Sequence, residues 1–129
     1  MRDSGRATDG LSGLARLTRA TRVGMTALSW AFREEEAFRL EVLGSLLLLP
    51  LGLWLGHGGA ERALLCAAVM QVMIVELLNT GIEVVVDRIS PERHALSGLA
   101  KDLGSAAVMV SLFLAAVVWA CILLPRLFG

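Results

Sequence analysis

The chain has 129 residues, 56% of them hydrophobic, and a mean hydropathy of +0.68, so it is too apolar for an ordinary soluble domain of this size. Its 12 basic and 12 acidic residues give a formal net charge of zero, which argues against general nucleic-acid binding because that normally needs an excess of basic surface. We therefore expect an all-α integral membrane protein, with a single membrane domain over residues 11–129.

The N-terminal part of the chain predicts a tail followed by a surface helix. Residues 1–10 are polar and lack apolar periodicity, which predicts a flexible tail. Residues 11–34 repeat large apolar side chains at helical spacing and carry arginines around the other side. Such an amphipathic helix is typical of the membrane interface, and we favour that location over a soluble core because few other segments could cover its apolar side. The arginine-rich start places the N-terminus in the cytoplasm.

Three apolar stretches, at about 38–55, 63–86 and 104–124, predict membrane-spanning helices. Pro50 in the first can be tolerated because neighbouring groups can satisfy the freed carbonyl. We expect the third to end before Pro125. The segment between the second and third stretches contains Arg88, Arg93 and Lys101, which indicates a cytoplasmic loop and leaves the C-terminus outside.

Four polar residues in the second span carry the strongest chemical signal. Glu76, Asn79, Glu83 and Asp87 follow one another at spacings of three and four residues, so they share one helix face. Ionised Glu76 facing lipid would cost about 3 kcal/mol, so it must face protein, water or an ion. Polar contacts between helices are the structural alternative. Three carboxylates in line repel one another, and Mg²⁺ binding is the function that we favour.

Charged residues flanking the spans allow two interpretations each. The run Glu34 to Glu36 lies at the interface before the first span, where simple solvation is the alternative to a functional role and spacing selects none of the three. Lys101, beside Asp102, is the only lysine. Its ammonium could snorkel to the interface, or it could bind nucleotide phosphates. Spacing alone leaves both interpretations open.

The segments IVELLNTGIEVVVDRIS and HALSGLAKDLGSAAV resemble the small bacterial diacylglycerol kinases and their undecaprenol kinase relatives. The resemblance extends from the EAFRLE segment to the C-terminus, and more weakly back to Arg16. It implies ATP-dependent phosphorylation of the primary hydroxyl of diacylglycerol, giving phosphatidate, at the cytoplasmic face of the bacterial inner membrane. Undecaprenol is the alternative substrate. The resemblance also implies a homotrimer with shared active sites. The lack of a GxxxxGK[ST] loop or a protein-kinase signature agrees with this family.

The resemblance also implies roles for individual residues. Glu76 resembles the general base, with Asn79 beside it, and Glu35 and Glu83 resemble ligands of Mg²⁺. The lipid-substrate side would comprise Trp54, Glu76, Ser105 and Trp119. The ATP and metal side would comprise Arg16, Glu35, Glu83, Asp87, Glu92, His94, Lys101 and Asp102. The segment 24–29 departs from the family pattern, because Gly24-Met25-Thr26 and Ser29 stand where members carry a Ser-Trp-Lys run and an arginine.

A non-catalytic proton or cation conduit is the hypothesis from another functional class, since an intramembrane acidic face could relay ions. A conduit needs polar groups through the full depth of the membrane. Residues 63–75, the outer half of the second span, offer only Gln71. A purely structural subunit would not explain the acidic face or the position of Lys101 at the same membrane depth as that face. We therefore favour the kinase.

Overall fold

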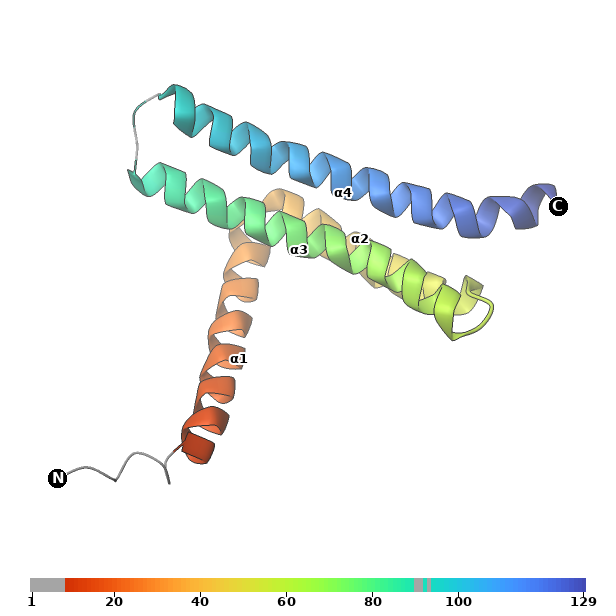
Figure 1. Cartoon of the computed structure of the whole chain (residues 1–129), viewed down its shortest axis with the longest axis horizontal. Coiled ribbons are helices and arrows are strands. Elements are labelled where there is room, and N and C mark those ends of the chain that lie inside the picture. Colours follow the sequence, from red (N-terminus) through yellow and green to blue (C-terminus); the bar gives the residue numbers. More distant parts are fainter. Residues whose placement is uncertain (1–8, 90–91, 93) are drawn as a thin grey trace. The chain divides into compact units, whose positions relative to one another are not determined.

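The computed structural model describes residues 9–89, 92 and 94–129, with side chains from residue 12 onward. Residues 1–8 of the predicted tail, and residues 90, 91 and 93 of the predicted loop, lie outside the described part. Within that part the chain forms four helices and no strand, which confirms the all-α prediction (Figure 1). The helices are α1 (Asp9–Glu34), α2 (Glu36–Leu55), α3 (Gly59–Ile89) and α4 (Ala95–Phe128).

The chain divides into two compact units, of which the first ends at Glu36 and the second spans Ala37–Gly129. The first unit consists of α1, which begins at Asp9, two residues before the predicted start. Leu14 and Leu17 on this helix are exposed, and so are Arg16 and Arg19. An apolar stripe beside arginines is typical of a helix in the membrane interface.

The second unit contains three helices that are long and apolar enough to cross a membrane. With 31 and 34 residues, α3 and α4 are longer than the predicted spans 63–86 and 104–124. At 1.5 Å per residue they reach about 46 and 51 Å, against about 30 Å for the hydrocarbon layer. Their charged ends therefore extend beyond the apolar layer. The helix itself continues past the predicted end of the third span, because α4 runs to Phe128, and Pro125 costs it one backbone hydrogen bond.

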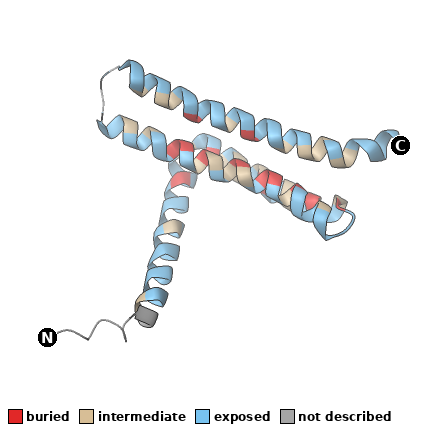
Figure 2. Ribbon diagram, viewed as in Figure 1, coloured by how far each residue is buried: buried red, intermediate tan, exposed pale blue. Residues whose placement is uncertain are grey.

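The core of this unit lies along one face of α3, which packs side by side with antiparallel α4 (Figure 1). The buried residues of α3 recur at helical spacing along that face (Figure 2): Leu65, Ala68, Val69, Val72, Glu76, Asn79 and Thr80. The buried residues of α4 are Gly104 and Ser111. α2 meets α3 at Gly52, where an added Cβ would lie only 3.1 Å from the Cβ of Leu65.

The outer faces of α2 and α4 remain apolar and exposed. Leu46 and Leu47 on α2, and Val110 and Phe113 on α4, are each more than 60% exposed. Soluble proteins rarely expose a contiguous apolar surface of this extent. Lipid or further protein must cover these faces, as expected for membrane-spanning helices.

Candidate active site on the α3–α4 pair

Side-chain hydrogen bonds to backbone carbonyls hold α3 and α4 together in the apolar part of the pair. The Gln71 amide nitrogen donates to the carbonyl of Ser111 over 2.7 Å. The indole N–H of Trp119 donates to the carbonyl of Leu65 over 3.1 Å. Polar groups in a membrane interior are costly unless they are paired, so these bonds fix the alignment of the two helices.

The acidic face predicted from the sequence runs from the core of the unit to its surface. Glu76 is only 6% exposed and Asn79 only 8%. Glu83, two turns further along, is half-buried, and Asp87 is exposed. Within a single chain Glu76 is therefore covered by protein, which agrees with the expectation that it faces protein, water or an ion rather than lipid. A carboxylate in such a protected place is suited to proton transfer, because water does not compete for it.

Asn79 projects against the backbone of α4 at Gly104. A Cβ placed on Gly104 would collide with the Asn79 amide oxygen, so the two helices approach closely here only because position 104 lacks a side chain. That amide oxygen is buried and has no hydrogen-bond partner. A buried acceptor left unpaired costs about 1–3 kcal/mol, which marks Asn79 as a residue kept for something other than stability.

The acidic face ends at an ion pair with α4. Lys101 Nζ lies 2.6 Å from Asp87 Oδ1. Glu83 is also within electrostatic reach of the Lys101 ammonium. Asp102 and Ser105 lie nearby on α4 and are exposed. The structure thus brings Asp87, Glu83 and Lys101 together at one end of the α3–α4 pair, where an accessible cation faces two carboxylates.

Glu41 of α2 is a candidate that our sequence analysis did not single out. Its carboxylate oxygen Oε2 is buried without a hydrogen-bond partner. Its negative charge also interacts unfavourably with that of Glu76. Glu41 and buried Ser45 line a cavity of about 140 Å³ that is otherwise apolar. Glu41 could have been identified from the sequence in the same way as Glu76, because it is a charged residue inside the predicted span 38–55.

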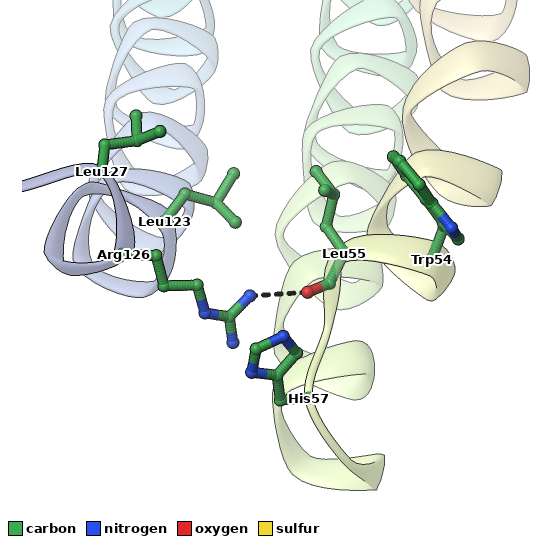
Figure 3. Close-up of a pocket in the computed structure, with 6 residues that line it drawn as sticks. All are labelled: Trp54, Leu55, His57, Leu123, Arg126 and Leu127. Carbon is green, nitrogen blue, oxygen red and sulfur yellow. Dashed lines mark hydrogen bonds between the residues drawn. The ribbon is translucent and has the colours of Figure 1, made fainter.

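Of the two tryptophans predicted to contact lipid, Trp54 lies near the other end of this unit and Trp119 lies between the two ends. Trp54 is 77% exposed and lines a hollow of about 430 Å³ (Figure 3). Arg126 closes this end, because its guanidinium donates to the carbonyl of Leu55 over 2.6 Å and pairs with Glu61. From Glu61 to Asp87 the axis of α3 rises about 39 Å. Within one chain, Trp54 is therefore not close to Lys101.

The remaining predicted nucleotide contacts have varied surroundings. His94 caps α4: its backbone is extended, and its Nδ1 accepts a hydrogen bond of 3.1 Å from the Leu96 N–H. This gives His94 a structural role whatever else it binds. Glu92 is exposed. Arg16 is exposed on α1 and half-buried Glu35 follows that helix, and both belong to the first unit.

Carboxylate oxygens are the donors present for a metal ion. Across the described residues, no group of three or more His, Cys, Asp or Glu side chains is close enough to hold one. Glu83 and Asp87 lie one turn apart on α3, and Asp87 is already paired with Lys101. The chemistry of these donors fits a hard cation such as Mg²⁺, which usually takes one or two protein carboxylates together with substrate phosphates.

Comparison with known proteins shows the family of the chain. Residues 22–123 match the family model for prokaryotic diacylglycerol kinase. The chain is 46% identical to a diacylglycerol kinase of Escherichia coli over 118 residues, which cover 92% of this chain and 96% of the relative. It is 48% identical to one of Pseudomonas aeruginosa over 115 residues, covering 89% and 94%.

More distant relatives extend over the same part of the chain. A diacylglycerol kinase of Helicobacter pylori is 34% identical over 117 residues, or 91% of each chain. The matched region contains the whole acidic face of α3 and the Lys101–Asp102 pair of α4. Since the family model covers most of the chain and relatives align along nearly their full length, the chain belongs to the prokaryotic diacylglycerol kinase family.

Proposed function

We propose that this protein is an ATP-dependent lipid kinase that phosphorylates the primary hydroxyl of diacylglycerol and releases phosphatidate and ADP. Family membership supports the reaction. The structural observation that carries the proposal is the acidic face of α3, which leads from buried Glu76 to the exposed Lys101–Asp87 pair. Glu76 would take the proton of the lipid hydroxyl, and the exposed pair would meet the nucleotide. Because about 16 Å of helix axis separates Glu76 from Asp87 within one chain, the two sides of a working site would come from neighbouring chains.

Glu76 acts as the general base in this proposal. The lipid hydroxyl oxygen attacks the γ-phosphorus of ATP, the bond to the bridging oxygen of ADP breaks, and the hydroxyl proton passes to the Glu76 carboxylate. Asn79 lies one turn from Glu76 on the same buried face and orients the reacting groups. Because Glu76 is shielded by protein, its carboxylate is held ready for the proton without competition from solvent.

Lys101 and Asp102 form the nucleotide side. The Lys101 ammonium is partly exposed and can bind phosphate oxygens as a compact positive charge. Arg16, Glu92 and His94 complete this side. Glu35 and Glu83 would hold Mg²⁺, which neutralises phosphate charge when it is bound. The half-buried carboxylate of Glu83, one turn from Asp87 on the acidic face, supports this assignment.

Diacylglycerol is the substrate that we favour over undecaprenol, in agreement with the names of the relatives. Ser105 lies one position after Gly104 and is exposed, so it can contact the polar end of the lipid. Trp119 and Trp54 lie further along the helices and are proposed to contact the apolar part of the lipid. The exposed apolar faces of α2 and α4 supply the surfaces for a homotrimer.

Offering the two lipids separately tests the function. Purified protein in detergent micelles receives Mg-ATP with either diacylglycerol or undecaprenol, and labelled phosphate is followed into the lipid fraction. We expect phosphatidate from diacylglycerol and little product from undecaprenol. If only undecaprenol is phosphorylated, the assignment of diacylglycerol as the substrate is wrong. If neither lipid is phosphorylated, the assignment of kinase activity is wrong.

We propose an inner-membrane topology with the N-terminus in the cytoplasm and the C-terminus outside, so that the Lys101–Asp87 end meets cytoplasmic ATP. A single cysteine tests this in a background without Cys66 and Cys121. At Gly58, in the turn between α2 and α3, it should react with an impermeant thiol reagent in intact cells. At Glu92 it should react only after permeabilisation. The reverse pattern would place the acidic end on the wrong side for ATP.

A further inference from the structure

The contact between Asn79 and Gly104 is specific to those two residues. For a Cβ built on Gly104, the three nearest atoms all belong to the Asn79 side chain: the amide oxygen, which it would strike, Cγ at 3.2 Å and Cβ at 3.8 Å. Both residues are buried. The space over Gly104 is therefore occupied by the Asn79 amide rather than by the backbone of α3.

General helix packing does not account for this contact. Small residues let the backbones of two membrane helices approach closely. Gly52 shows that pattern, since an added Cβ there would contact Leu65, Trp119 and Cys66 from two different helices. At Gly104 a single catalytic-site side chain fills the space, so the glycine serves that side chain.

The unpaired amide oxygen of Asn79 points to the same conclusion. On either side of this level the helices are joined by polar contacts, Asp87 with Lys101 and Gln71 with the carbonyl of Ser111. At the level between them the Asn79 oxygen is buried against Gly104 without a hydrogen bond. The Asn79 amide oxygen therefore does not join α3 to α4 by a hydrogen bond, although it lies between two levels where such polar contacts are made.

We infer that Gly104 is a positioning residue for phosphoryl transfer: its missing side chain leaves the space in which α4 holds the Asn79 amide beside Glu76. This inference rests on the proposed function. A methyl group at position 104 would displace the Asn79 amide, while Lys101, one turn away on α4, would keep its ion pair with Asp87. Loss of orientation should then lower kcat and leave the KM for ATP nearly unchanged.

A double-mutant cycle tests the inference with Gly104→Ala, Asn79→Ala and the double variant. Gly81→Ala is the matched control, because Gly81 is exposed on α3 and nothing lies within 4 Å of an added Cβ. We expect Gly104→Ala to lower kcat about 10²-fold, as small misplacements of reacting groups do. Gly81→Ala should keep wild-type turnover, and a helical alanine should leave its stability unchanged or higher.

The double variant is the decisive member of the cycle. If Gly104 acts through Asn79, the double variant should have the kcat of Asn79→Ala alone, because the added methyl group no longer has an amide to displace. Its thermal midpoint in detergent should likewise return to that of Asn79→Ala, whereas Gly104→Ala alone should unfold at lower temperature. Losses in kcat and in thermal midpoint that simply add would show that Gly104 is only a packing residue and overturn the inference.

The two readouts separate this inference from the proposed function. The thermal midpoints need no kinase activity, so they test the Asn79–Gly104 contact even if the wild-type chain phosphorylates neither lipid. The thermal midpoints of the cycle could show coupling between the two positions while Asn79→Ala keeps full turnover. That result would show a structural contact without a positioning role, and it would also overturn the inference. Coupling in both kcat and thermal midpoint is the result that supports it.

Discussion

Lys101 Nζ lies 2.6 Å from Asp87 Oδ1, and this ion pair joins the first turns of α4 to the last turns of α3. The two side chains are 42% and 65% exposed, so water screens their attraction. Exposed ion pairs of this kind stabilise proteins by about 0–1 kcal/mol. The pair is therefore too weak to account for Lys101 as a structural residue, and it leaves the ammonium accessible to a second anion.

We predict that Lys101→Met lowers kcat/KM for ATP about 10- to 100-fold, which corresponds to losing one charge-assisted hydrogen bond to phosphate. Its stability should change by less than about 1 kcal/mol. Asp87→Asn, at another residue of the nucleotide side, separates loss of the ion pair from loss of the lysine, since it weakens the same pair but keeps the ammonium. Steady-state kinetics over a range of ATP concentrations measures both. Equal losses in the two variants would show that the ion pair, rather than phosphate binding, is what matters.

Glu83→Gln should raise the Mg²⁺ concentration needed for half-maximal rate, because the substitution removes a charged oxygen ligand but keeps the shape of the side chain. The measurement is a Mg²⁺ titration at saturating ATP and diacylglycerol. Glu61→Gln, at the opposite end of α3, is the matched control and should give the wild-type titration. A wild-type titration for Glu83→Gln would remove Glu83 from the metal site.

Glu41→Gln should stabilise the protein by about 1 kcal/mol, because it removes a charge whose buried oxygen has no partner and which faces the charge of Glu76. Thermal unfolding in detergent, followed by circular dichroism, gives the comparison with wild type. If the midpoint falls instead, the carboxylate of Glu41 must make a stabilising contact in the assembled protein.

Mixing two impaired variants tests whether active sites are shared between chains. Along α3, Glu76 is separated from Asp87, the partner of Lys101, by about 16 Å of helix axis, so one chain does not bring the base and the lysine together. We predict that Glu76→Gln and Lys101→Met recover partial activity when they are unfolded and reassembled together. No recovery in verified mixed oligomers would assign Glu76 and Lys101 to the same site of one chain.

The sequence predicted the helices and the acidic face because both depend on local patterns. A glutamate in an apolar helix is conspicuous, and spacings of three and four residues place Glu76, Asn79, Glu83 and Asp87 on one side whatever the tertiary structure. Hydropathy marks only the part of a helix that hydrocarbon covers. The polar ends of α3 and α4 were therefore missed, and so was the continuation of α4 past Pro125.

Contacts between helices could not be predicted in the same way. The approach of Gly104 to Asn79, and the unpaired oxygen of Glu41, depend on how segments distant in the chain align. Gly104 also stands in a run of small residues that predicts close packing without naming its partner. The capping role of His94 depends on where α4 begins, and helix boundaries are the least certain part of any sequence prediction.

The turnover of Glu76→Gln is the most direct test of the account. Glutamine keeps the size and most of the polarity of the side chain but cannot accept the hydroxyl proton as a carboxylate does. We predict that kcat with Mg-ATP and diacylglycerol falls about 10²- to 10⁴-fold, while helical content and oligomer size remain those of wild type and Glu61→Gln stays active. A folded Glu76→Gln protein with turnover within a few-fold of wild type would contradict the assignment of the buried carboxylate as the general base.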